Sequence, residues 1–290
     1  MRVIDLMHLG RERVIGCWQV DDVLIDPGPT SGLPTLLDAL AGQEPRALLL
    51  THIHLDHAGA SGALVRRWPG LEVYVHSRGA RHMVDPSRLL LSAKRLYGDN
   101  MDRLWGEMIP VPERNLRVIE EGAQVLDGRF LVAYTPGHAW HHVSYLHEGT
   151  AFVGDVGGVR IPHSSLTIPP TPPPDIDLEA WHRSIELLAG WAPERLAMTH
   201  FGESTHVEGQ LDELGERLDA WVALVRDHGE EAFLAHVRAE IERCAGPDLL
   251  PAYMLAAEPE QMYSGLERYL RKRAETDGSA APGADRAQVS

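Results

Sequence analysis

Three histidines and an aspartate fall within six residues, at His52, His54, Asp56 and His57. They come directly after the fully apolar run 47–50, which is typical of a buried strand. On a helix, side chains two residues apart point about 200° away from each other, so His52 and His54 can share a metal ion only on a loop. Three imidazoles and a carboxylate are more ligands than one tetrahedral metal ion with an open position uses. The cluster therefore indicates a metal site and favours two ions over one.

Three further potential ligands each follow an apolar run that is typical of a strand: His138, Asp155 and His200. In a layered α/β protein, the loops that leave one edge of a sheet build a common site. Ligands that are distant in the sequence therefore become neighbours in space. The complete candidate set has seven members: His52, His54, Asp56, His57, His138, Asp155 and His200.

The order of these residues resembles the metallo-β-lactamase superfamily, whose motif HxHxDH is followed by single His, Asp and His positions. The resemblance extends from about residue 3 to about residue 205, and it includes Asp26 in an Asp-Pro-Gly turn. It implies an α/β fold, the αβ/βα four-layer sandwich of that superfamily. It also implies two divalent metal ions, which are usually zinc but are iron or manganese in some members.

The same resemblance implies a role for each candidate residue. The first metal ion would be bound by His52, His54 and His138. The second would be bound by Asp56, His57 and His200. Asp155 would bridge the two ions, and Asp26 would orient the ligands from behind.

Such a site predicts metal-assisted hydrolysis. Two dications close together lower the pKa of a bridging water to about neutrality, so we expect a metal-bridging hydroxide as the nucleophile. Asp155 and Asp56 would be the catalytic carboxylates, and Asp56 or a metal-bound water would relay a proton to the leaving group. The diiron, oxygen-reducing branch of the superfamily has a glutamate at the position of His54, which argues against that chemistry. We expect a small ester, thioester or lactone as substrate, because the hydroxyacylglutathione hydrolase and lactonase branches are similar in motif and size.

Two other functions stay open at this point. One is hydrolysis of a small phosphodiester, because the RNA-processing branch shares the HxHxDH pattern. The other is a non-catalytic metal-binding protein. The formal net charge of −15, from 27 Lys and Arg against 42 Asp and Glu, disfavours nucleic acid and anionic membranes as partners. The sequence does not decide the native metal, the physiological substrate or whether the chain forms a homodimer.

The elements that must position these residues alternate between apolar runs and helical periodicity. We expect a metallo-β-lactamase-like domain over 1–205, a helical C-terminal region over 206–273 and a disordered tail over 274–290. Within the first domain, 77–108 carries Leu, Tyr, Trp and Met residues at helical spacing. This segment is expected to be a helical insertion, which either covers the site as a lid or has a structural role only.

The composition is that of a folded protein, with 44% hydrophobic and 24% charged residues. Cys17 and Cys244 are too few for a disulfide framework, which favours a reducing compartment. Residues 1–18 lack the continuous apolar stretch of a signal peptide, and no later run approaches the roughly 18 apolar residues of a spanning helix. We therefore expect a cytoplasmic protein that acts on a small molecule.

Overall fold

Two six-stranded sheets form the centre of the protein. A computed structural model describes residues 1–279. The first sheet contains, in spatial order, β1 (Arg2–Asp5), β2 (Gly16–Val20), β3 (Val23–Ile25), β4 (Ala47–Leu49), β5 (Glu72–His76) and β6 (Leu116–Ile119). The second contains, in spatial order, β12 (Gly202–Ser204), β11 (Arg195–Met198), β10 (Thr150–Phe152), β9 (Val143–His147), β8 (Phe130–Tyr134) and β7 (Gln124–Val125).

Parallel pairs in each sheet fix where the functional loops emerge. Strands β3, β4, β5 and β6 run parallel to one another, and β10 runs parallel to β11. The carboxyl ends of parallel strands lie at the same edge of a sheet. The loops after β3 and β4 therefore leave the first sheet together, and those after β10 and β11 leave the second sheet together.

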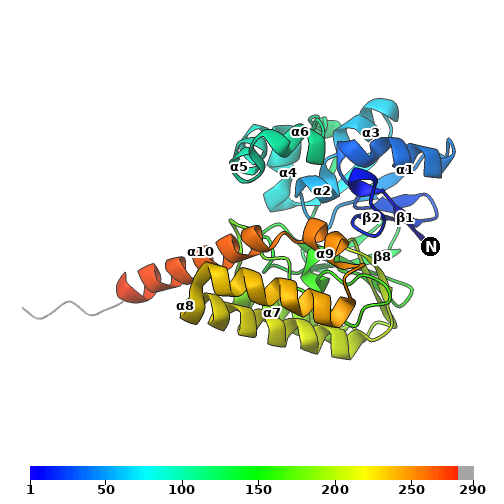
Figure 1. The fold of residues 1–290 in the computed structure, drawn as a ribbon. Coiled ribbons are helices and arrows are strands. Elements are labelled where there is room, and N and C mark those ends of the chain that lie inside the picture. The colour runs from blue at the N-terminus through cyan, green and yellow to red at the C-terminus, as the bar shows by residue number, and fades with distance from the viewer. Residues whose placement is uncertain (280–290) are drawn as a thin grey trace, which may run out of the picture.

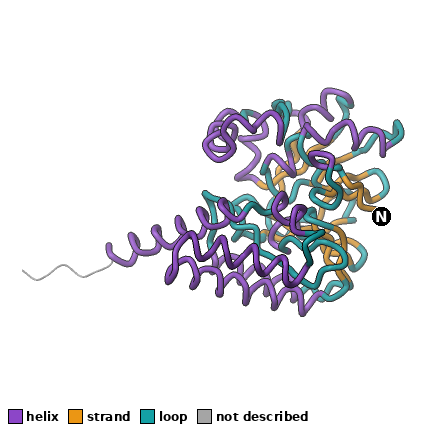
Figure 2. Tube along the Cα trace, viewed as in Figure 1, coloured by secondary structure: helices purple, strands orange, loops and turns teal. Residues whose placement is uncertain are grey.

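Helices cover both outer faces of the sheet pair. Figure 1 shows α1 to α6 on one side of the molecule and α7 to α10 on the other, and Figure 2 shows the strands between them. The first group comprises α1 (Leu33–Leu40), α2 (Leu55–Ala58), α3 (Ser61–Arg67), α4 (Ser77–Val84), α5 (Ser87–Tyr97) and α6 (Met101–Leu104). The second comprises α7 (Leu178–Gly190), α8 (Val207–Ala245), α9 (Leu250–Ala256) and α10 (Pro259–Ser279). The predicted αβ/βα sandwich with a helical C-terminal region is confirmed.

The strands are apolar on both faces because each face is covered. Alternate side chains of a strand point to opposite faces. In β3, Val23 and Ile25 belong to one buried cluster with Phe130 and Phe152 of the second sheet. Leu24, between them, belongs to the other cluster, which contains the helix residues. Strands that are buried in this way read as continuous apolar runs.

Helix α8 reverses direction at Gly229. The backbone there is not helical (φ 75°, ψ −168°), a conformation that glycine adopts without a Cβ penalty. The two halves then pack against each other, because the guanidinium of Arg217 lies 3.2 Å from the carboxylate of Glu240. The rings of Trp221 and Phe233 also meet edge to face at 5.4 Å. The result is an antiparallel helix pair.

The structure differs from the expected tail. Helix α10 continues to Ser279, so the first residues of the segment 274–290 are helical. Extending a helix adds one hydrogen bond per residue without a new nucleation step, so apolar packing is not needed at these positions. Residues 280–290 lie outside the described residues. Over residues 1–279, no helix combines the length and apolar character that crossing a bilayer requires.

Candidate metal centre

The HxHxDH segment begins three residues after the end of β4 and contains a loop followed by one turn of helix. His52 and His54 lie on the loop after β4, as their spacing predicts, whereas Asp56 and His57 lie in the one-turn helix α2. The backbone of His54 is extended (φ −60°, ψ 153°), and the helix starts at the next residue. This turn brings the rings of His52 and His57 to within 4.0 Å of each other, centre to centre.

The other candidates arrive from the second sheet. His138 follows β8, and His200 follows β11. Asp155 lies in a one-turn 3-10 helix, Gly154–Gly157, which follows β10. All seven predicted residues are brought together. Three groups have ligand atoms within 4.8 Å of one another: His52, His54 and His138; His52, His57 and Asp155; Asp56, His57 and His200.

Asp155 lies between the two sets of histidines. Its Oδ2 atom is 3.2 Å from Nε2 of His138. Its Oδ1 atom is 3.1 Å from Nε2 of His57 and 3.6 Å from Nε2 of His200. The two oxygens of one carboxylate therefore face different groups, so that this side chain could ligate an ion in each group.

The Nδ1 atoms of four rings have polar partners that fix the ring orientation. His138 Nδ1 lies 2.8 Å from the carbonyl oxygen of Pro170, and His200 Nδ1 lies 2.6 Å from that of Val14. His57 Nδ1 lies 2.8 Å from Asp26, and His52 Nδ1 lies 3.1 Å from the Thr51 hydroxyl. A ring that donates from Nδ1 leaves Nε2 as a lone-pair ligand. His54 instead presents Nδ1, which is 3.0 Å from Nε2 of His138.

Four buried atoms at this site make no hydrogen bond of good geometry. They are Nε2 of His52, His57 and His200, and Oδ1 of Asp155. Unpaired buried polar atoms are costly and call for an explanation. These four converge, and imidazole nitrogen with carboxylate oxygen is the donor set that zinc, iron and manganese accept. The residues therefore fit a divalent metal site.

Asp26 supports the site from the end of β3. Its Oδ1 accepts the backbone N–H of Thr51 at 2.8 Å. Its Oδ2 is 2.7 Å from the Thr51 hydroxyl, 2.8 Å from the Thr199 hydroxyl and 2.8 Å from His57 Nδ1. The side chain is completely buried. Asp26 thus links the backbone before His52, the residue before His200 and the ring of His57.

Burial and neighbouring charges shift the pKa values of the ligand histidines in opposite directions. Burial lowers the pKa of His138 to about 4 and, with neighbouring rings, lowers the pKa of His52 well below its usual value. Burial also opposes charge on His57, but Asp155, Asp56 and Asp26 outweigh it and raise the pKa of His57 well above its usual value. Burial would raise the pKa of Asp155, but His57, His138 and His200 lower it well below its usual value. Asp155 is therefore ionised and ready to ligate.

Two histidines outside the candidate set pack against the ligands. His142 is fully buried, with Nδ1 2.9 Å from the Thr135 hydroxyl and its ring stacked on His52 at 5.1 Å. His141 accepts the backbone N–H of Ile53 at 3.4 Å. These contacts give both residues a structural role beside the ligands.

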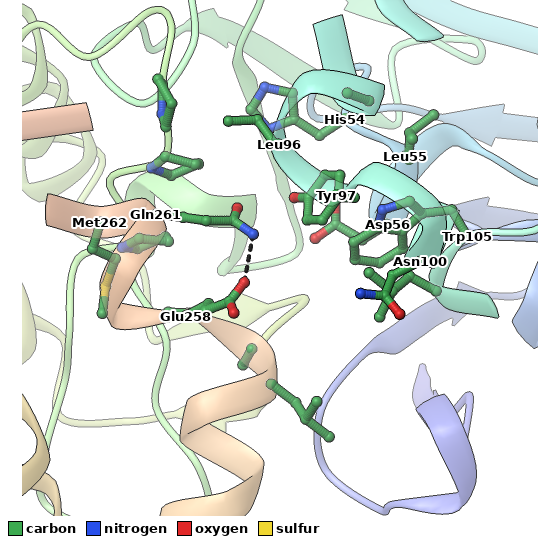
Figure 3. Close-up of a pocket in the computed structure, with 18 of the residues that line it drawn as sticks. His54, Leu55, Asp56, Leu96, Tyr97, Asn100, Trp105, Glu258, Gln261 and Met262 are labelled. Atoms are coloured by element: carbon green, nitrogen blue, oxygen red, sulfur yellow. Dashed lines mark hydrogen bonds between the residues drawn. The ribbon is translucent and has the colours of Figure 1, made fainter. Parts of the chain in front are cut away.

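A pocket opens beside the centre. Its floor includes His54, Asp56 and Asp155, and one wall comes from α5 and α6 of the insertion 77–108. Figure 3 shows Leu96, Tyr97 and Trp105 on that wall and Glu258, Gln261 and Met262 on the other. The second wall comes from α9, α10 and the residues between them. The insertion thus contributes directly to the pocket.

Comparisons with known proteins agree with this geometry. Among curated proteins, the metallo-beta-lactamase fold-containing protein ST1585 of Sulfurisphaera tokodaii is 27% identical over 194 residues, 64% of this chain and 70% of that protein. A hydroxyacylglutathione hydrolase of Xylella fastidiosa is 32% identical over 134 residues, 46% of this chain and 40% of that enzyme. The chain therefore matches less than half the length of the hydroxyacylglutathione hydrolase.

Solved structures show the same fold. The archaeal superfamily protein ST1585 from Sulfolobus tokodaii has a TM-score of 0.64 at 21% identity, covering 88% of this chain and 93% of that one. TTHA1623 in a di-iron-bound form has a TM-score of 0.51 at 28% identity, covering 67% of this chain and 92% of that one. The family model for the metallo-beta-lactamase superfamily matches residues 21–200, more than half of the chain. The protein therefore belongs to the metallo-beta-lactamase superfamily and is one of its hydrolases.

Proposed function

We propose that this hydrolase binds two divalent metal ions, with zinc favoured, and cleaves a small ester, thioester or lactone. The observation that carries the proposal is the position of Asp155, whose two oxygens face His138 on one side and His57 with His200 on the other. One group would hold an ion through His52, His54 and His138. The other would hold an ion through Asp56, His57 and His200.

Bound divalent ions at these residues would lower the pKa of water and polarise the carbonyl of the substrate. The chain supplies the rest of the chemistry. The Nδ1 partners of His57, His138 and His200 hold each ring in one orientation. Asp56 lines the pocket with 20% of its side chain exposed, and its Oδ2 lies 3.2 Å from His200. We assign Asp56 to hold the attacking water by a hydrogen bond and to relay its proton toward the leaving group.

Metal analysis and a substrate panel test this proposal. Protein expressed with ample metal should contain close to two ions per chain, and elemental analysis will identify zinc, iron or manganese. The panel should span aryl esters, lactones, glutathione thioesters and a small phosphodiester. Turnover of the phosphodiester alone would assign the second function that the sequence leaves open, and metal without turnover of any of these compounds would overturn the proposed substrate class.

Variants connect the turnover to this site. Asp155→Ala and His138→Ala should each abolish hydrolysis and lower the metal content. Asp212→Ala, an exposed aspartate on α8, is the matched control and should retain both. Unchanged turnover in both site variants would place the active site elsewhere.

A further inference from the structure

The pocket beside the metal centre is built from segments that are far apart in the sequence. Leu89 and Leu96 of α5 lie on one wall, and Met254 of α9 and Met262 of α10 lie on the other. Figure 3 shows the space between Leu96 and Met262, with Asp56 at the side of the metal centre. The cavity has a volume of about 320 Å³, which is within the size range of small-molecule sites.

Most of the residues that line the walls are apolar. Leu, Ala, Met, Trp and Pro side chains make up most of the lining. Tyr97 packs edge to face on Trp105 at 5.1 Å, so its ring also presents apolar surface. Among the polar residues, Gln261 already donates to the Glu258 carboxylate at 2.6 Å. A hydrocarbon chain would gain by leaving water along the apolar part of the lining, and the polar side chains of Ser92, Asn100 and Arg103 lie elsewhere in the pocket.

The second wall lies beyond the part of the chain that the family model matches. The family model matches residues 21–200, whereas Met254, Met262 and Gln261 lie beyond that range. Thr171 and the proline segment that follows it anchor this wall, because the Thr171 hydroxyl donates to the carbonyl of Met262 at 3.1 Å. The wall is thus fixed against the loop that also carries Pro170, the partner of His138. Its chemistry sets which acyl group can lie beside the ions.

We propose that this cavity binds a linear aliphatic acyl chain, so that the substrate is an ester or thioester of a fatty acyl group. The proposal rests on the function proposed above. The scissile carbonyl lies at the floor formed by His54, Asp56 and Asp155, and the hydrocarbon chain extends between the walls of α5 and α9–α10. Leucine and methionine walls suit such a chain because their side chains adapt to a flexible ligand. Leu96 and Met254 are the residues that set the preference for chain length.

A series of 4-nitrophenyl esters from acetyl to decanoyl tests this on the metal-loaded protein. We expect kcat/KM to rise about fourfold per added methylene until the cavity is filled. Leu96→Ser should lower kcat/KM for the octanoyl ester about tenfold and leave the acetyl ester unchanged. Leu91→Ser on the same helix is the matched control. Leu91 is 62% exposed and does not line the cavity, whereas Leu96 is 37% exposed and lines it. A flat series, or equal losses in the two variants, would overturn the acyl-chain proposal while leaving hydrolysis intact.

Binding of the product acid separates this proposal from the proposed function. Isothermal titration calorimetry with acetate, hexanoate and octanoate should show affinity that increases with chain length and decreases for octanoate in Leu96→Ser. This result would support the acyl site even if no ester in the panel were hydrolysed, in which case only the proposed function would fail. Equal affinity for the three acids, or tighter binding of benzoate than of octanoate, would contradict a linear aliphatic site.

Discussion

The Nδ1 atom of His57 lies 2.8 Å from Oδ2 of Asp26, and neither side chain has any exposed area. The two residues belong to neighbouring parallel strands, because Asp26 follows β3 and His57 follows β4 by way of α2. In the register of these strands Ile25 pairs with Leu49. The pairing of two short apolar strands therefore sets the contact that orients one metal ligand.

Replacement of Asp26 by asparagine should weaken metal binding. The amide keeps the shape of the carboxylate but removes its charge. Two hydroxyl groups and the Nδ1 atom of His57 converge on Oδ2 of Asp26. An amide NH₂ group in that position could not accept their hydrogen bonds. Loss of such a partner typically costs 10- to 100-fold in metal affinity. Chelator competition on Asp26→Asn should show a loss of this size. Asp21→Asn, at an exposed turn, is the control, and equal affinity of both variants with the unmodified protein would remove Asp26 from the site.

The ligands could be predicted from the sequence because each follows a buried strand, where an apolar run ends at a polar residue. The supporting hydroxyls left a weaker signal. Thr51 and Thr199 each directly precede a ligand, at His52 and His200, and both donate to Asp26. This repeated Thr-His pair at two strand ends is visible in the sequence, but its meaning depends on the position of Asp26 in three dimensions.

The parts of the fold that the sequence did not predict are short or exposed. Strand β12 has three residues, and β6 has two exposed residues among its four, so neither shows an apolar run. The second wall of the pocket, from α9 and α10, gave no signal for a different reason. Its Met and Leu residues have the spacing of an ordinary amphipathic helix, and only tertiary packing decides that they face a cavity.

Gly265 should be indispensable for the contact between α10 and the proline segment. A Cβ at this position would overlap the backbone oxygen of Thr171, which is not free to move as a side-chain end would be. Because Pro170 next to Thr171 accepts the hydrogen bond from His138, displacement of this loop should loosen one metal ligand. We expect Gly265→Ala to lower both the melting temperature and the metal affinity.

Gly190→Ala is the matched control for this substitution. Gly190 is the last residue of α7, and an added Cβ there has no neighbour within 4 Å. Alanine is about 1 kcal/mol better than glycine inside a helix, so Gly190→Ala should be neutral or slightly stabilising and should not change metal binding. Thermal unfolding and chelator competition on both variants measure the contrast. Unchanged metal affinity in Gly265→Ala would show that α10 does not support the centre.

The two groups of ligands should respond differently to pH. Metal ions bind the neutral imidazole, so they compete with protons. In the metal-free protein the pKa of His138 is about 4, lowered first by burial, so this ring is already neutral at pH 7. Burial also opposes charge on His57 and His200, but the surrounding carboxylates raise both pKa values above the usual one. Binding at Asp56, His57 and His200 must therefore release protons, and binding at His52, His54 and His138 should not.

As the pH falls from 8 to 6, the ion at His57 and His200 should be lost first. Its apparent affinity should decrease about tenfold per pH unit for each proton released, while the ion at His138 stays bound until the pH approaches the pKa of about 4. Elemental analysis after dialysis across this range should give two ions per chain, then one. Calorimetry in two buffers of different ionisation enthalpy should detect released protons for one binding step only. Simultaneous loss of both ions, or no proton release in either step, would contradict the opposite pKa shifts of His57 and His138. Either result would mean that the carboxylates do not hold a proton on His57 before metal binds.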